Sequence, residues 1–142
     1  MKHHLTSLFV VLALLMAGNG CTPGSDIGEW FGTWTVDSYT VDGAAQDLDP
    51  QGRQTTYYLQ FQHSVVCLRH TDALHDQGES YGNWNENHDA GAVTIKFDPL
   101  NYDVRIMPLE ADYTIARSDN RHITLSTTDA DGHQRRYELS KL

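Results

Sequence analysis

The chain has 142 residues, a formal net charge of −9 at neutral pH, two cysteines and 39% hydrophobic residues. This length and composition exclude a multi-domain enzyme, a polytopic membrane protein and a disulfide framework. Only 10 Lys and Arg side chains stand against 19 Asp and Glu, so no nucleic-acid partner is expected.

The first 20 residues are predicted to form a signal peptide outside the fold. Lys2 gives a basic start, and the apolar run 5–17 is too short for the ~20 residues that a membrane-spanning helix needs. Small residues at 18–20 then lead into Cys21. This pattern resembles the bacterial lipoprotein signal, in which the cysteine takes a diacylglycerol group, although glycine stands at position 18 where that signal usually has an aliphatic residue.

The two cysteines allow two interpretations. If Cys21 is the lipid attachment site, Cys67 has no partner and is expected to be a buried, inert thiol in the apolar segment 65–68. If ordinary signal cleavage occurs instead, Cys21 is free or forms a disulfide with Cys67. The first interpretation predicts export through the inner membrane and anchoring by the N-terminal lipid in the outer membrane, with residues 21–26 as a tether.

Beyond the tether, short runs rich in Thr, Tyr, Val, Ile, Phe and Trp are separated by turn signals, which is typical of β-strands. In the run 55–62, for example, Tyr57, Leu59 and Phe61 fall on one face. Strands are predicted at 33–41, 55–62, 65–70, 80–85, 92–98, 112–118, 122–127 and 133–142, and 104–106 could add a short one.

Helical periodicity is missing from the chain after the signal. We therefore predict one all-β domain over residues 27–142, a single antiparallel up-and-down β-barrel of about eight strands. A β-sandwich is the alternative, because the number of strands does not separate the two architectures.

The start of the domain, Glu-Trp-Phe-Gly-Thr-Trp-Thr-Val at 29–36, resembles the start of a lipocalin. Lipocalins open with a short 3₁₀ turn and then Gly-x-Trp on the first strand, where the tryptophan closes the barrel base. The resemblance implies that Gly32 and Trp34 form this base and that Arg135 or Arg136 packs over Trp34. The segment 111–113, Ala-Asp-Tyr, is similar to the family's later Thr-Asp-Tyr turn.

Together with the signal, these features are similar to small lipocalin-like lipoproteins of gut-type Gram-negative bacteria over residues 27–142. The chain is shorter than a full lipocalin and lacks that family's C-terminal helix and usual disulfide. The resemblance therefore implies a lipocalin-like barrel with a smaller or filled cavity.

The resemblance and the aromatic content predict a protein that binds a small apolar or amphipathic ligand inside the barrel. The alternative is a protein-interaction or protease-inhibitor barrel without a small ligand, which would contact an envelope protein through loops 42–54 and 72–79. The candidate cavity-lining residues are Val36, Tyr57, Leu59, Phe61, Trp84, Ile95, Phe97, Ile123, Leu125 and Tyr137.

Patterns that carry enzyme chemistry are missing. The histidines lack metal-ligand spacing, although strand pairing could bring His63 or His70 beside His122. The segment 129–132, Asp-Ala-Asp-Gly, lacks the later ligands of a calcium loop and is interpreted as a hairpin turn. We therefore expect no enzyme activity, no metal and no cofactor.

Overall fold

The computed structural model describes Trp30 and residues 32–142. The predicted signal peptide 1–20, the tether 21–26 and the lipid attachment site Cys21 lie outside the described residues. Within the described part, no helix has the length and apolar character required to cross a membrane.

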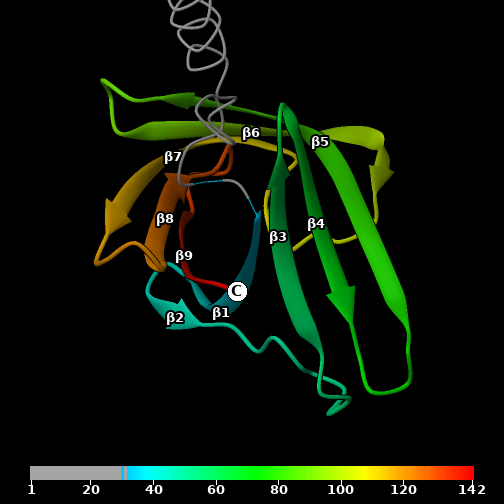
Figure 1. Cartoon of the computed structure of the whole chain (residues 1–142). Helices are drawn as coiled ribbons and strands as arrows, with labels where there is room; N and C mark the ends of the chain where they lie inside the picture. Colours follow the sequence, from blue (N-terminus) through cyan, green and yellow to red (C-terminus); the bar gives the residue numbers. More distant parts are fainter. Residues whose placement is uncertain (1–29, 31) are drawn as a thin grey trace, which may run out of the picture.

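The described residues form one antiparallel sheet that closes on itself. The strand order in the sheet is β2-β1-β3-β4-β5-β6-β7-β8-β9, and β9 pairs back onto β1 (Figure 1). The strands are β1 (Gly32–Val41), β2 (Ala44–Ala45), β3 (Thr56–Gln62), β4 (Val65–Thr71), β5 (Gln77–Asn87), β6 (Ala92–Tyr102), β7 (Glu110–Arg117), β8 (His122–Thr128) and β9 (Gln134–Lys141).

This arrangement is a closed eight-stranded up-and-down β-barrel, with β2 as a short addition. The predicted fold class is confirmed, and the β-sandwich alternative is wrong because one continuous sheet replaces two packed sheets. Closure removes the unpaired sheet edges that would otherwise be exposed. The described strands and core lie between residues 30 and 142.

The hydrophobic core fills the inside of the barrel, because alternate side chains of each strand point inward. In β3, Leu59 and Phe61 are buried while Tyr58 and Gln60 lie on the outer side, as the alternation predicts. The buried cluster consists of Trp30, Trp34, Val36, Leu59, Phe61, Val66, Leu68, Val93, Ile95, Phe97, Val104, Met107, Tyr113, Ile123, Leu125, Tyr137 and Leu139.

Aromatic rings pack together at one end of the barrel, which we call the base. Trp30 lies in a 3₁₀ turn and Gly32 opens β1 with a φ of 117°. Trp34 is fully buried, and its Nε1 donates to the Trp30 carbonyl oxygen at 3.2 Å.

The cation over Trp34 is Lys141, whose Nζ lies 5.6 Å from the ring centroid. The expectation that Arg135 or Arg136 packs there is wrong, because antiparallel pairing places these residues opposite Val41 and Thr40, at the far end of β1. The segment 111–113 also differs from the expected turn, since it lies within β7.

Strand β6 is longer than predicted and contains a wide bulge. Ser80 pairs with Tyr102 and Gly82 pairs with Phe97, so residues 98–101 loop out of the ladder. At the start of this loop, β6 approaches Gly82 so closely that an added Cβ would lie 2.0 Å from the Lys96 carbonyl oxygen. The bulge explains how Pro99 is accommodated within the bounds of a strand, since no regular ladder hydrogen bond is needed there.

The predicted short strand at 104–106 is wrong. These residues lie in the connection between β6 and β7, which we call the capping segment, residues 103–109. Beyond the bulge, the chain leaves the sheet after Tyr102 and rejoins it at Glu110. Val104 and Met107 therefore join the core cluster rather than a sheet edge.

Candidate functional site

The predicted lining residues all belong to the inner face. Most of them are buried in the core cluster, and Tyr57 and Trp84 are partly buried and pack against it. Phe61 and Trp84 contact Trp30 at the base, with ring centroids 5.0 and 6.1 Å from that of Trp30. These residues contact other side chains of the core, so their role as the lining of a ligand cavity stays a prediction.

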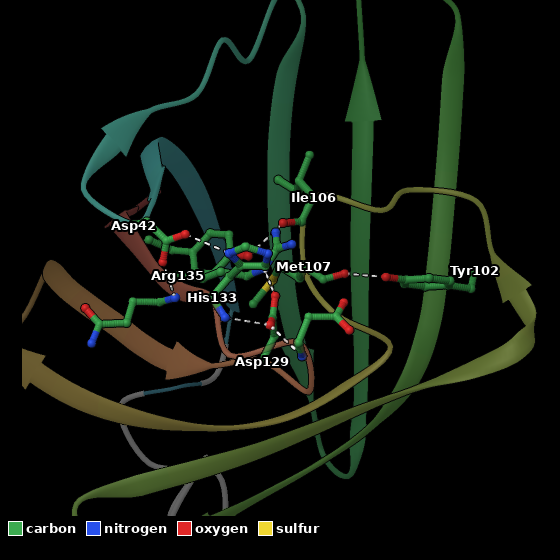
Figure 2. A network of polar contacts seen from close by, with 10 residues as sticks. Asp42, Tyr102, Ile106, Met107, Asp129, His133 and Arg135 are labelled. Carbon is green, nitrogen blue, oxygen red and sulfur yellow. Dashed lines mark hydrogen bonds and ion pairs between the residues drawn. The ribbon is translucent and has the colours of Figure 1, made fainter.

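The capping segment covers the end of the barrel opposite the tryptophans. Ser80 Oγ accepts from the Val104 amide and donates to the Val104 carbonyl oxygen, both at 2.8 Å. The hydroxyl of Tyr137 donates to the Ile106 carbonyl oxygen at 2.7 Å, and that of Tyr102 donates to the Met107 carbonyl oxygen (Figure 2). Side-chain hydroxyls therefore fasten this segment, in place of a strand ladder.

A charged pair lies beside the capping segment on β9 and the turn before it. Arg135 Nε donates to Asp129 Oδ2 at 2.8 Å, and the two side chains are 25% and 8% exposed (Figure 2). Arg135 lowers the pKa of Asp129 through this hydrogen bond, and backbone amides at the turn add to the effect. The barrel end thus contains a paired, partly covered charge among aromatic rings.

Tyrosine rings of β1, β7 and β9 pack against one another inside the barrel. Tyr39 stacks on Tyr137 with ring centroids 5.4 Å apart, and Tyr113 meets Tyr137 edge to face at 6.1 Å. Burial raises the pKa of Tyr113 well above its ordinary value and also raises that of Tyr137. We call Tyr102, Tyr113, Tyr137 and Arg135 the tyrosine–arginine cluster.

A second polar contact joins the turn after β1 to the β8–β9 hairpin. His133 Nδ1 lies 2.7 Å from Asp42 Oδ2, and the Gln134 amide donates to Asp42 Oδ1 at 2.9 Å (Figure 2). The Gln134 amide and then His133 lower the pKa of Asp42, while Asp42 raises that of His133. The predicted turn at 129–132 is present, with a φ of 85° at Gly132.

The remaining histidines and Cys67 do not build a site. His70 packs against Tyr57 with ring centroids 5.8 Å apart, and His122 contacts Asp119 at 2.9 Å. Strand pairing does not bring His63 or His70 beside His122, because β3 and β4 do not pair with β8. The described residues contain no group of three or more side chains suited to hold a metal ion. Cys67 is a free, buried thiol on the outer side of β4, and burial raises its pKa.

The outer surface carries a polar groove of about 510 Å³ over β1, β9, β8 and β7. Its lining includes four residues that are neighbours across the strands, Thr40, Arg136, Ser126 and Thr114. Arg136 is already paired with Glu138 at 2.7 Å. Arg135 and Arg136 both line this groove.

The sequence interpretation missed the tyrosine–arginine cluster. The alternation that places Tyr137 and Leu139 inside the barrel also places Arg135 there, and this signal was present in the sequence. A charged residue at an inward position was the available sign of a polar site. Tyr113 follows in the same way from alternation along β7.

The comparisons with known proteins support the fold. No family model matches the chain, and no curated protein matches its sequence. Its structure is similar to a lipocalin-like protein from Bacteroides uniformis, with 14% identity, a TM-score of 0.59, and coverage of 81% of this chain and 100% of the other. A protein from Bacteroides eggerthii described as uncharacterized gives 14% identity, a TM-score of 0.57, and coverage of 80% and 99%. The chain therefore has a lipocalin-like fold.

Proposed function

We propose that this protein binds a small apolar or amphipathic molecule at the barrel end that the capping segment covers, and that it acts without catalysis. The observation that carries the proposal is the capping segment. Two of its side chains, Val104 and Met107, are buried in the core, and its carbonyl oxygens receive the Tyr102 and Tyr137 hydroxyls. The segment thus occupies the barrel end with the groups that an amphipathic ligand would offer.

Binding requires the capping segment to move outward. It is held by a few side-chain hydrogen bonds, each of which contributes about 1 kcal/mol net, by a backbone bond from Phe97 to Leu109, and by burial of Val104 and Met107. A ligand that fills the vacated space restores both the apolar contacts and the acceptors. Only molecules whose capping segment has moved outward can bind, so the apparent affinity for the ligand falls as the closed population grows. A change that loosens the segment should therefore tighten binding.

The test uses the chain from Thr22 to Leu142, which contains every described strand and the described core. It is titrated with the neutral fluorescent probe N-phenyl-1-naphthylamine, and adducts are counted by native mass spectrometry. Saturable binding of one probe per chain is expected. Met107→Ala, which removes a buried side chain from the segment, should tighten binding.

The matched control is Leu100→Ala, in the nearby bulge, where the side chain is 90% exposed. This variant should bind the probe like the unmodified chain. Failure of the unmodified chain and of Met107→Ala to bind the probe would overturn the proposal.

A protein partner is the second candidate, and the exposed Leu74 favours it. This side chain is 68% exposed in the connection between β4 and β5. The connection is held rigidly, since Asp72 accepts from the Leu74 and Asp76 amides at 2.8 and 2.9 Å. Crosslinking in the envelope should capture one stoichiometric protein, and Leu74→Asp should abolish the capture.

We also propose that the chain is an exported lipoprotein anchored in the outer membrane through Cys21. The support is the sequence alone: an apolar run of signal-peptide length followed by small residues and a single cysteine. Mass spectrometry of the mature N-terminus tests this directly. A diacylglyceryl cysteine at position 21 is expected, and an unmodified N-terminus beyond that position would refute the anchor.

A further inference from the structure

The outer wall of the barrel carries a second groove, of about 220 Å³, over the neighbouring strands β3, β4 and β5 (Figure 1). The residues that line it alternate along these strands with buried core residues, so the groove faces away from the barrel interior. It shares no residue with the capping segment or with the larger groove over β1, β9, β8 and β7. It is therefore a separate candidate site.

The strand register explains why a groove forms here. Cys67 on β4 lies opposite Gln60 on one side and opposite Tyr81 on the other. Its short side chain is set between two long ones, and it is buried although it points outward. Val65 lies two positions back along β4 and shares the same face. Cys67 and Val65 thus give the groove an apolar floor.

The walls of the groove carry planar polar groups with unused hydrogen-bonding capacity. The Gln60 amide donates to Thr33 Oγ1 at 3.2 Å and keeps its carbonyl oxygen as an acceptor. Arg69 Nη1 lies 4.0 Å from Glu79 Oε1, which is beyond hydrogen-bond distance, and the buried Arg69 Nε has no hydrogen-bond partner among the described residues. Gln62 adds a second amide. The walls therefore offer both donors and acceptors to a ligand.

The charges of the lining favour a neutral ligand. Arg69 and Glu79 are its charged side chains, and they have opposite signs. An anion in the groove would meet the Glu79 carboxylate, and a cation would meet the Arg69 guanidinium, so attraction and repulsion offset each other. Tyr81 donates its hydroxyl to Glu79 Oε2 at 2.6 Å, and its ring is exposed to solvent beside the floor. An exposed ring of this kind can cover the apolar face of a ligand.

We propose that this groove binds a neutral hexopyranosyl unit of a carbohydrate. The C–H face of the sugar ring packs on the floor and on the Tyr81 ring. Each sugar hydroxyl both donates and accepts, which matches the mixed donors and acceptors of the walls. The volume suits a single ring, since sites for drug-sized ligands span roughly 300–1,000 Å³. This binding is a further function, independent of the ligand proposed at the capped end of the barrel.

The experiment is a nuclear magnetic resonance titration of the chain from Thr22 to Leu142, which contains all the residues that the structure describes. The probes are methyl β-D-glucopyranoside, methyl β-D-galactopyranoside and methyl β-D-mannopyranoside. At least one of them should shift the side-chain amide signals of Gln60 and Gln62 saturably. The backbone signals of Thr114 and Ser126, in the larger groove, should stay in place. Absence of shifts at Gln60 and Gln62 with all three sugars would overturn the proposal.

A pair of variants on β5 localises the sugar. Tyr81→Ala removes the exposed ring and should weaken binding of the sugar roughly tenfold. Asn85→Ala changes an exposed position on the same face of β5, outside the groove, and should bind the sugar like the unmodified chain. Equal affinities of the two variants would overturn the assignment of the sugar to this groove.

Glu79→Gln tests the preference for a neutral ligand. The new amide still donates and accepts, but Arg69 loses the opposite charge beside it. The neutral sugar should bind with little change, whereas methyl β-D-glucuronide, an anion, should bind roughly tenfold more tightly than it binds the unmodified chain. Tighter binding of the glucuronide than of the neutral glucoside by the unmodified chain would overturn the neutral class. N-phenyl-1-naphthylamine should bind all these variants alike, since the groove shares no residue with the capping segment.

Discussion

The two ends of the barrel are closed by different kinds of contact. At the base, Trp30, Trp34, Phe61 and Trp84 pack ring against ring, with Lys141 over Trp34. At the opposite end, hydroxyls fasten the capping segment beside a charged pair. Loss of a ring from the base leaves a void in a close-packed cluster. A hydroxyl that donates to a carbonyl oxygen of the capping segment can instead donate to a ligand.

The largest expected effect comes from breaking the base. Trp34→Ala removes a fully buried indole and its hydrogen bond to Trp30, so the free energy of unfolding should fall by about 3–5 kcal/mol. Equilibrium unfolding in urea measures this loss. Leu100→Ala is the control and should change stability by under about 0.5 kcal/mol. Equal stability of the two variants would contradict a structural role for the base.

Gly82→Ala should give the next largest effect, because the added Cβ would collide with the backbone of β6 at Lys96 and Phe97. We expect a loss of about 2–3 kcal/mol in unfolding free energy, measured in the same way. Asn83→Ala, on an exposed neighbouring position, is the control. A neutral result at Gly82 would mean that β6 can leave the bulged register without cost.

Ser80→Ala tests the fastening of the capping segment. The Ser80 side chain is fully buried, and its removal leaves the amide and carbonyl groups of Val104 without their partner. A loss of about 2 kcal/mol is expected, with faster hydrogen exchange at the Val104 amide. Ser126→Ala, on the outer wall, should change neither quantity. Unchanged exchange at Val104 would show that other contacts hold the segment.

The smallest effect concerns pH at the exposed His133–Asp42 contact. His133 has a pKa raised above 6.5, so its contribution is complete below 6.5 and is lost as the pH rises through the raised value. Asp42 has a pKa lowered from 3.8, so its contribution is present above 3.8 and is lost as the pH falls through the lowered value.

Between these two limits the contact should be strongest. Nuclear magnetic resonance titration of the His133 ring should show the raised pKa, and Asp42→Asn should return it toward 6.5. Asp119→Asn, which alters a carboxylate beside His122 instead, is the control and should leave the His133 titration unchanged. A His133 pKa that Asp42→Asn does not change would contradict the contact.

Alternation of side chains was sufficient to place most strands, as β3 illustrates with Leu59 and Phe61 inside the barrel. Alternation failed to predict the chain beyond Phe97. The bulge in β6 depends on a close approach between two strands, which leaves no periodic pattern in the sequence. Alternation also failed to identify the cation over Trp34. That position depends on which residue of β9 lies opposite β1, and pairing register follows from closure of the whole barrel.

The sequence by itself determined an all-β chain with a lipocalin-like start and an aromatic base, because period-2 patterning and the Gly-x-Trp segment are local features. Only the tertiary structure decided that the hydroxyls of Tyr102 and Tyr137 donate to the capping segment and that Tyr113 packs against Tyr137. These residues lie on β6, β7 and β9, and closure of the sheet brings their inner faces together.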